Sequence, residues 1–208
     1  MTVGASTYDR IQNEKYFTPA WVIEALIAAE SFDKVWDPAG GDGAIVSSLP
    51  STMTVWASDI EPDSDFVQRL DFFECEDANG YDIVSNPPYG VQSRLAVRFI
   101  EHALRLTEFH GGKVAMLLKV GFDSADGRRH LFDQHPAFAV EYRLTRRIRW
   151  TNVPQKENGP TENHSWFVWD WRKRRGPAEK AYLPLRSQPV LDFDHGVDVT
   201  HLVGRKAP

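Results

Sequence analysis

The 208-residue sequence predicts an α/β domain built around a mostly parallel β-sheet. Strand-like apolar runs alternate with helical patterns along the chain, and this order is typical of a parallel sheet covered by helices. One run, KVAMLLKV at 113–120, is apolar almost throughout, as expected of a strand buried on both faces. With 42% hydrophobic residues the chain can form a sizeable core, so we expect a single domain.

The helices are predicted from capping residues and from apolar periodicity. Thr18 can cap a helix and Pro19 suits its first position, which predicts a helix over 19–30. Apolar residues recur at helical spacing along QSRLAVRFIEHALRLT, which predicts an amphipathic helix over 92–107. Further helices are expected at 44–49, 63–70 and 126–134.

The strands are predicted from short apolar runs that end at turn residues. They are expected at 34–37, 54–58, 81–85, 113–120, 138–144 and 165–171. The polar stretch TNVPQKENGPTENH at 151–164 is the longest expected loop. Loops of this length are often functional.

The charge distribution restricts how the protein could contact nucleic acid. The net charge is −5, so the molecule as a whole does not attract polyanions, and only local patches could bind them. Two basic clusters exist, RLTRRIR at 143–149 and RKRR at 172–175. Arg146 and Arg147 are our candidates for contacts with a phosphate backbone, although such runs are more often solvated surface.

The cysteine and histidine content gives no indication of a disulfide or a metal site. Cys75 is the single cysteine, and the histidines never fall at zinc-ligand spacing. No apolar run approaches the ~20 residues that a bilayer span needs, and the first residues lack the apolar core of a secretory signal. We therefore expect a cytoplasmic protein with no metal ion and no membrane partner.

The stretch VWDPAGGDG at 35–43 carries the first chemical motif. A strand is expected to end at Asp37, and Gly40, Gly41 and Gly43 then lead into a helix, an arrangement in which the backbone approaches a nucleotide-like ligand. A dinucleotide fingerprint starts with glycine rather than an acid, because a carboxylate repels phosphate. Asp37 instead favours a ligand with cationic and donor groups, such as S-adenosylmethionine. A glycine-rich turn without a ligand is the alternative.

Acidic residues further along the chain extend this pattern. Asp59 ends the next strand, where an acid can accept hydrogen bonds from ribose hydroxyls. Asp71 and Phe72 follow, offering a carboxylate for an adenine amino proton and a ring to lie against the base. Taken singly, an aspartate at a strand end is more often a turn residue, and Phe72 is more often part of the core.

The stretch YDIVSNPPYG at 81–90 carries the second motif. Its prolines fix φ and remove donors, so the Asn86 side-chain oxygen and the Pro87 carbonyl can be presented as paired acceptors on a stiff loop. Two acceptors suit an exocyclic NH2 group, which is a poor nucleophile until its lone pair is localised. Tyr89 can stack on the base that carries the amine. The alternative is a proline turn after a strand.

In their order along the chain, KYFTP, DPAGGDG, SDI, LDFF and NPPY resemble the motifs of S-adenosylmethionine-dependent amino-methyltransferases, specifically the DNA adenine type of bacteria and phages. The resemblance covers 15–120 and continues weakly through RIRW and SWFVWDW. It implies a single-domain Rossmann-like methyltransferase fold, with a mostly parallel seven-stranded sheet, helices on both faces and an antiparallel C-terminal hairpin. It also implies methyl transfer to the exocyclic amine of adenine in DNA.

The resemblance assigns roles to individual residues. Asn86, Pro87, Pro88 and Tyr89 would be catalytic. The cofactor-binding residues that it implies are Tyr16, Thr18, Asp37, Pro38, Ala39, Gly40, Gly41, Gly43, Asp59, Ile60, Asp71 and Phe72. In the family a later aromatic residue packs on the target base; Trp150 is the candidate and Trp166 the alternative, and both could equally be core residues.

The sequence departs from the family in one respect. Only 37 residues follow Trp171, and we expect 1–14 and 172–208 to be peripheral extensions, with no separate target-recognition domain. The adenine amine is hidden inside a DNA duplex, so the base must be flipped out or the DNA must be single-stranded. A partner subunit or a homodimer remains open.

Three other functions also remain open. The NPPY motif occurs in enzymes that methylate the glutamine amide of release factors and in enzymes that methylate guanine amines of ribosomal RNA. Only 36 residues precede Asp37, which is short for the helical domain of the glutamine enzymes, and KYFTP favours the DNA type, whereas the acidic net charge does not. A non-catalytic cofactor-binding subunit is the third alternative.

Overall fold

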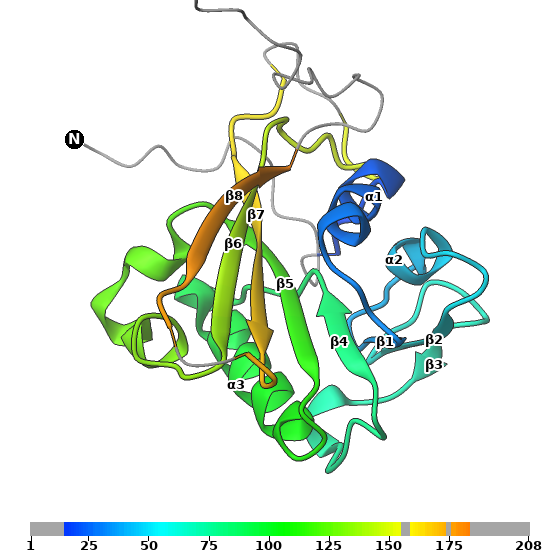
Figure 1. Ribbon diagram of the computed structural model, residues 1–208. Helices are drawn as coiled ribbons and strands as arrows, with labels where there is room; N and C mark the ends of the chain where they lie inside the picture. The colour runs from blue at the N-terminus through cyan, green and yellow to red at the C-terminus, as the bar shows by residue number, and fades with distance from the viewer. Residues whose placement is uncertain (1–14, 155–158, 174–175, 184–208) are drawn as a thin grey trace, which may run out of the picture.

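The structure, a computed structural model, describes residues 15–154, 159–173 and 176–183. Its centre is one eight-stranded sheet in the order β3-β2-β1-β4-β5-β7-β6-β8. The strands are β1 (Lys34–Asp37), β2 (Thr54–Asp59), β3 (Gln68–Arg69), β4 (Asp82–Ser85), β5 (Lys113–Lys119), β6 (Phe138–Leu144), β7 (His164–Asp170) and β8 (Glu179–Leu183). Figure 1 shows the sheet twisting from β3 on one side to β8 on the other.

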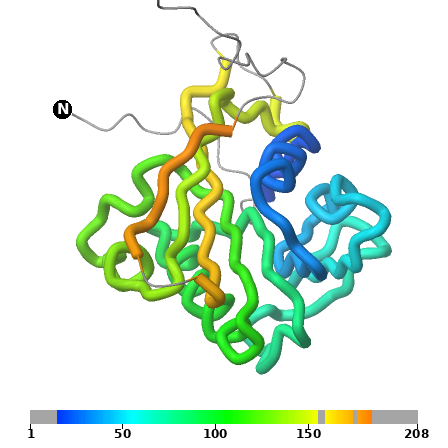
Figure 2. The backbone as a smooth tube through the Cα atoms, viewed as in Figure 1, coloured from blue at the N-terminus to red at the C-terminus, as the bar shows by residue number. Residues whose placement is uncertain are grey.

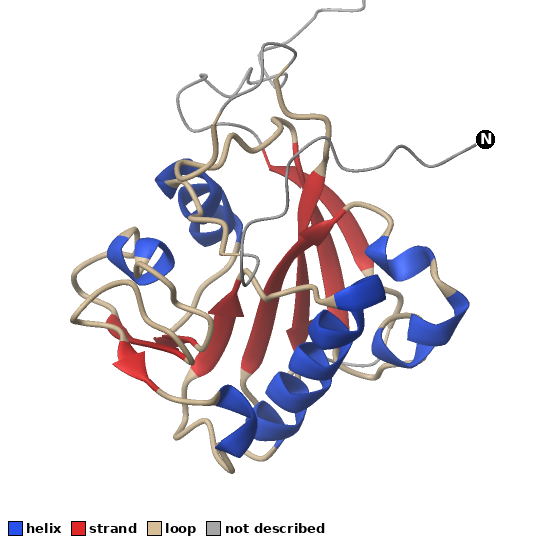
Figure 3. Ribbon diagram, turned by 180° about the vertical axis from the view of Figure 1, so that it is seen from behind, coloured by secondary structure: helices blue, strands red, loops and turns tan. Residues whose placement is uncertain are grey.

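Helices cover both faces of this sheet (Figures 1 and 3). On one face α1 (Ala20–Ala29) packs on residues such as Ala115, Leu117 and Trp166. On the other, α3 (Arg94–Glu108) packs on Met116 and Leu118. Neighbouring residues of β5 thus belong to opposite cores, which explains why the residues between Lys113 and Lys119 are all apolar. The short helix α2 (Ala44–Ser47) lies beside β1, and the tube view in Figure 2 follows the chain through all these elements.

The predicted α/β class, the strands and the two long helices are confirmed. Strands β3, β2, β1, β4 and β5 are parallel, and β7 is antiparallel to both β5 and β6, as the predicted C-terminal hairpin requires. The sheet has eight strands rather than seven among the described residues, because β8 pairs with β6 inside the segment expected to be peripheral. Residues 1–14, 174–175 and 184–208 of the expected extensions lie outside the described residues.

The predicted helix over 63–70 is wrong. This segment turns and then forms β3, which pairs in parallel with the end of β2. Val67 is 3% exposed and packs on Ala57, and Trp56 donates a hydrogen bond to the Gln68 side chain. Tertiary contacts with β2 therefore outweigh the local helical preference.

Two further local predictions need correction. Thr18 does not cap α1, whose N-cap is Pro19 with no side-chain hydrogen bond. The helix expected at 126–134 is a 3₁₀ helix, η5 (Asp126–Leu131), and another 3₁₀ turn, η3 (Val91–Ser93), precedes α3. No helix in the described part of the chain is long and apolar enough to cross a bilayer.

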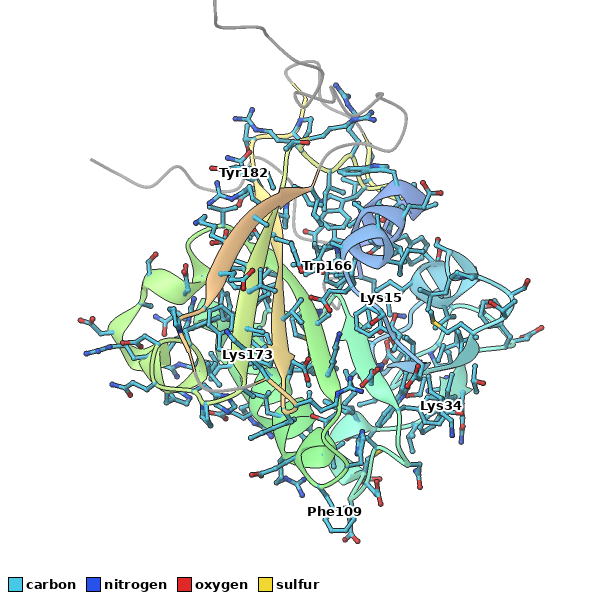
Figure 4. All side chains as sticks on the ribbon, in the orientation of Figure 1. Lys15, Lys34, Phe109, Trp166, Lys173 and Tyr182 are labelled. Carbon is cyan, nitrogen blue, oxygen red and sulfur yellow. The ribbon has the colours of Figure 1, made fainter. Side chains whose placement is uncertain are left out.

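The parallel strands end at one edge of the sheet, which we call the carboxyl edge. Asp37, Asp59 and Ser85 close β1, β2 and β4 there, while β7 begins at the same edge because it runs the opposite way. Figure 4 labels Lys34 at the start of β1 and Lys173 just after β7, both toward the opposite edge. The carboxyl edge is the place where α/β sheets bind ligands.

Candidate active site

A cavity of about 300 Å³ lies at the carboxyl edge beyond β1, β2 and β4. Residues Lys15–Thr18, which we call the strap, form one of its walls. Of the residues named from the sequence, those that line it are Tyr16, Thr18, Asp37, Pro38, Ala39, Gly40, Gly41, Asp59, Ile60, Asp71, Phe72, Asn86 and Pro88. The structure thus brings residues that are distant in sequence together around one space.

Asp37 forms the floor of the cavity and is 1% exposed. Its Oδ1 accepts hydrogen bonds from the Ser85 hydroxyl (2.7 Å) and the Ala39 N–H (3.2 Å). No described residue donates to its Oδ2. Burial raises the pKa of this carboxyl to about 7 despite the two hydrogen bonds. A cation or a donor placed at Oδ2 would stabilise the ionised form.

The glycine loop is folded back onto β2. The Gly40 N–H donates to the Ser58 carbonyl (2.8 Å) and the Gly41 N–H donates to Asp59 Oδ2 (2.9 Å). Gly43 has φ +82° and does not line the cavity; a Cβ atom there would overlap the ring of Phe66. Gly43 therefore suits the turn because of its left-handed backbone conformation, whereas the exposed Phe66 ring could move aside.

Asp59 and Asp71 also accept hydrogen bonds from backbone N–H groups. Asp59 accepts from the Glu61 N–H through Oδ1 (2.8 Å) in addition to its bond to the glycine loop. Asp71 accepts from the Phe73 N–H (2.9 Å) and so caps the 3₁₀ helix η2 (Phe72–Glu74). Phe72 is 3% exposed yet reaches the cavity wall. These residues are turn and core residues and cavity-lining residues at once.

Asn86 lies at the end of β4, and its side chain faces the strap. Nδ2 donates to the Tyr16 carbonyl (3.1 Å) and to Thr18 Oγ1 (3.3 Å). Among the described residues, no donor reaches Asn86 Oδ1 or the carbonyl oxygen of Pro87. The loop thus carries two acceptor oxygens that have no partner among the described residues.

Tyr89 lies beside the cavity rather than in its wall. Its hydroxyl accepts a hydrogen bond from the Lys119 N–H (2.7 Å), and its ring meets Phe122 edge-on at 6.2 Å. Its carbonyl accepts from the N–H groups of Leu95 and Ala96 at the start of α3. Tyr89 is therefore fixed to the ends of both β5 and α3.

The two candidate tryptophans belong to the core. Trp166 is fully buried and donates from Nε1 to the Val22 carbonyl (3.0 Å), so it is not available to stack on a base. Trp150 is 5% exposed and packs between Tyr16 and His164, each at 5.3 Å between ring centroids. It supports the strap and does not line the cavity.

The basic clusters lie at opposite edges of the sheet. Arg146 and Arg147 are exposed at the carboxyl edge; Arg147 donates to Asn163 Oδ1 (3.1 Å), and Arg146 lies over the Trp21 ring. Arg172 and Lys173 follow β7 at the other edge, and the two arginines after them lie outside the described residues. RKRR is therefore remote from the cavity.

Some residues of the site were not predicted from the sequence. Asn152 holds the strap, donating to the Lys15 carbonyl (2.7 Å) and accepting from the Phe17 N–H (3.1 Å). Ser85 holds Asp37. Ser85 directly precedes the proline loop, which is a usable signal, but nothing local identifies Asn152, which is 135 residues from its partner Phe17.

No protein-family model matches this sequence, and no curated protein is similar to it in sequence. Solved structures are similar in fold. A protein of Vibrio vulnificus, named as the modification subunit of a type I restriction enzyme, is 13% identical with a TM-score of 0.55, and the match covers 84% of this chain and 48% of that protein. The chain thus spans about half the length of that subunit.

Two other similar structures are named as methyltransferases. A class I S-adenosylmethionine-dependent methyltransferase of Listeria monocytogenes is 14% identical with a TM-score of 0.53, over 79% of this chain and 62% of that protein. An RNA methyltransferase of Pyrococcus horikoshii is 15% identical with a TM-score of 0.55, over 80% of this chain and 91% of that protein.

The chain has the class I methyltransferase fold. The methyltransferase fold that the sequence motifs implied is therefore confirmed. At identities of 13%, 14% and 15% the likeness shows the fold alone, and it assigns no role to any residue of the site.

Asp37 gives a test of the site that needs no ligand. Its carboxyl group keeps its proton to about pH 7 in the folded chain but releases it near pH 3.8 when unfolded. The folded state binds more protons between these values, so the free energy of unfolding should decrease as the pH rises from 4 to 7. Urea unfolding across this range should show that Asp37→Asn removes this part of the decrease. An unchanged pH profile in the variant would contradict the assignment.

Proposed function

We propose that this protein transfers a methyl group from S-adenosylmethionine to the exocyclic amine of adenine in DNA. The observation that carries the proposal is Asn86: its amide is held by the strap through Nδ2, and its Oδ1 has no partner among the described residues. This acceptor stands beside a cavity whose floor is the buried carboxyl group of Asp37.

The residues of the cavity suit this methyl donor. Asp37 would bind the ammonium group, because a cation at Oδ2 favours the ionised carboxylate. Asp59 would accept from the ribose hydroxyls and Asp71 from the adenine amine, since each carboxylate oxygen can accept more than one hydrogen bond. Ile60 and Phe72 would enclose the adenine ring. The volume of about 300 Å³ lies in the range of small-molecule sites.

The other proposed donor contacts come from the strap and the glycine loop. Tyr16 and Thr18 would hold the methionine part, with Pro38, Ala39 and the glycines Gly40 and Gly41 at its side. Gly43 would act only through the turn. S-adenosylmethionine, when bound, supplies an electrophilic methyl carbon on a positively charged sulfur.

The proline loop would bind the amine that receives the methyl group. The lone pair of an aromatic amine is delocalised into its ring, so the amine attacks poorly. Asn86 Oδ1 and the Pro87 carbonyl would each accept a hydrogen bond from the NH2 group, which favours a tetrahedral nitrogen whose lone pair points toward the cavity. Pro88 keeps the loop stiff, and Tyr89 would support the base. The nitrogen that gains the methyl group becomes cationic and acidic, so it can release its extra proton to water without a strong general base.

Access to DNA is proposed at the carboxyl edge. Arg146, Arg147 and Arg149 are exposed in the loop after β6 and form no ion pair with a described carboxylate. They would bind phosphates and position a flipped-out or unpaired adenine without reading sequence. We propose a single catalytic domain in which target recognition depends on a partner subunit, as the likeness to a modification subunit suggests.

A second candidate substrate is a base amine of RNA. It is favoured by the fold likeness to an RNA methyltransferase, which extends over 91% of that protein. Both candidate substrates require the same proline loop. They differ in the nucleic acid, DNA or RNA, that carries the base.

Labelled S-adenosylmethionine distinguishes the substrates. The protein is incubated with DNA, with RNA and with cell protein separately, and the modified atom is identified. The expected product is N6-methyladenine in DNA. Label in an RNA base would favour the second candidate, and donor binding without transfer to any of the three would contradict methyl transfer itself.

Asn86→Ala tests whether Oδ1 of this residue accepts a hydrogen bond from the substrate amine. Loss of Oδ1 should lower the single-turnover rate by about 10²- to 10³-fold, the effect of removing one preorganised hydrogen-bonding group. Donor affinity should fall by about tenfold or less, since only hydrogen bonds to the strap are lost on that side. Gln134→Ala removes an exposed amide and is the control. Turnover that persists in Asn86→Ala would exclude Asn86 as the acceptor.

Arg147→Ala tests the DNA surface. The affinity for DNA should fall, and the slope of its logarithm against the logarithm of salt concentration should decrease in magnitude by about 0.9, the value for one phosphate contact. Arg172→Ala, which removes an exposed arginine at the opposite edge, should leave the slope unchanged. An unchanged slope in Arg147→Ala would remove this residue from the interface.

A further inference from the structure

The strap is held from two sides by the amides of two asparagines. Asn86 comes from the loop after β4, and Asn152 comes from the loop after β6. The first asparagine is the proposed acceptor of the substrate amine. The second has no role in the function proposed above.

The strap determines which atom of the Asn86 amide, Nδ2 or Oδ1, is left available to a ligand. Both contacts of Nδ2 are acceptors on the strap, the Tyr16 carbonyl and Thr18 Oγ1. Rotating the amide by half a turn would lose the bond to the Tyr16 carbonyl and would set Oδ1 against that carbonyl oxygen, although the Thr18 hydroxyl could turn to donate to Oδ1. An unbonded acceptor next to another acceptor is unfavourable. The position of the strap therefore keeps Oδ1 available.

Asn152 fixes the strap with both ends of its own amide. Its Oδ1 accepts from the Phe17 N–H at 3.1 Å, and its Nδ2 donates to the Lys15 carbonyl at 2.7 Å. These partners are two residues apart, as they would be on the edge of a neighbouring strand. Tyr16 lies between them and gives its carbonyl to Asn86. One short segment thus joins the two amides.

Other contacts keep the strap over the cavity at its ends. Lys15 Nζ forms an ion pair with Asp63 Oδ2 at 2.8 Å. Thr151 donates to the Phe17 carbonyl at 3.4 Å, and the Tyr16 ring packs on Trp150. Asn152 is the residue that engages the strap backbone with both a donor and an acceptor, and it closely follows the arginine loop.

We propose that Asn152 is a positioning residue for methyl transfer: by holding Lys15 and Phe17 it orients Tyr16, and Tyr16 in turn keeps Asn86 Oδ1 directed to the amine. The inference rests on the function proposed above. Asn152 closely follows the loop that carries Arg146 and Arg147. Nucleic acid bound by that loop would therefore also affect the strap, which orients Asn86.

The first test measures the Asn86 amide without any activity. In ¹⁵N-labelled protein, the side-chain NH2 signal of Asn86 is identified by its loss in Asn86→Ser. Asn152→Ala should speed its hydrogen exchange about tenfold, because the strap loses two hydrogen bonds. Asn152→Asp should do the same although its size is unchanged, since its second oxygen would face the Lys15 carbonyl. Gln134→Glu, the same chemical change at an exposed residue, should have no effect.

The second test uses kinetics. Asn152→Ala and Asn152→Asp should lower kcat about tenfold per folded molecule, with the KM for DNA changed less than about twofold. In an Asn86→Asp background the Nδ2 bonds to the strap are already lost, and a carboxylate has two equivalent oxygens and needs no orientation. The same Asn152→Ala change should therefore cost little there.

The outcomes separate the two proposals. If the wild-type protein transfers no methyl group to DNA, the proposed function fails, and the exchange measurement still decides whether Asn152 positions Asn86. Unchanged exchange of the Asn86 amide in Asn152→Ala would overturn the positioning role. So would an equal loss of kcat, about tenfold, in the wild-type and Asn86→Asp backgrounds, since that pattern indicates general destabilisation. If Asn86→Asp has no measurable turnover, the exchange result decides alone.

Discussion

A buried hydrogen bond from the Ser85 hydroxyl to Asp37 Oδ1 joins the carboxyl ends of β4 and β1. Both residues are at most 1% exposed, and each begins a loop of the site: the glycine loop follows Asp37 and the proline loop follows Ser85. The relative position of these loops therefore depends on this contact. Its partners are costly to leave unpaired in the interior, so the two strand ends must stay in register.

The buried carboxyl group also sets the chemistry of the cavity. With a pKa of about 7, Asp37 can take up a cation with little further cost, because binding charge at Oδ2 replaces a proton. Asp59 and Asp71 add carboxylates to the same walls, and the nearby ammonium of Lys15 is held by Asp63. Such a site disfavours phosphates and suits a ligand rich in donors. This is the reason for proposing S-adenosylmethionine rather than a dinucleotide.

Local patterns in the sequence were enough to predict the strands that carry the site and the two long helices, because apolar runs and helical spacing are short-range signals. The same holds for the motif residues that line the cavity after β1, β2 and β4, whereas Tyr16 and Thr18 lie before α1. Pairings between distant segments were not predictable. β3 was mistaken for a helix because its partner is β2, and β8 was missed because its pairing with β6 has no local signal. Trp166 was offered as a base-stacking residue, whereas its side chain is fixed under α1.

The central claim is that one ligand lies between Asp37 and Asn86, with its reactive end toward the proline loop. A crystal structure with bound S-adenosylhomocysteine, the demethylated product, tests this claim most directly. We expect the ammonium group within hydrogen-bonding distance of Asp37, the adenine between Ile60 and Phe72, and the sulfur on the side of Asn86. A ligand bound outside this cavity, or bound in it with its adenine against Asn86, would contradict the account.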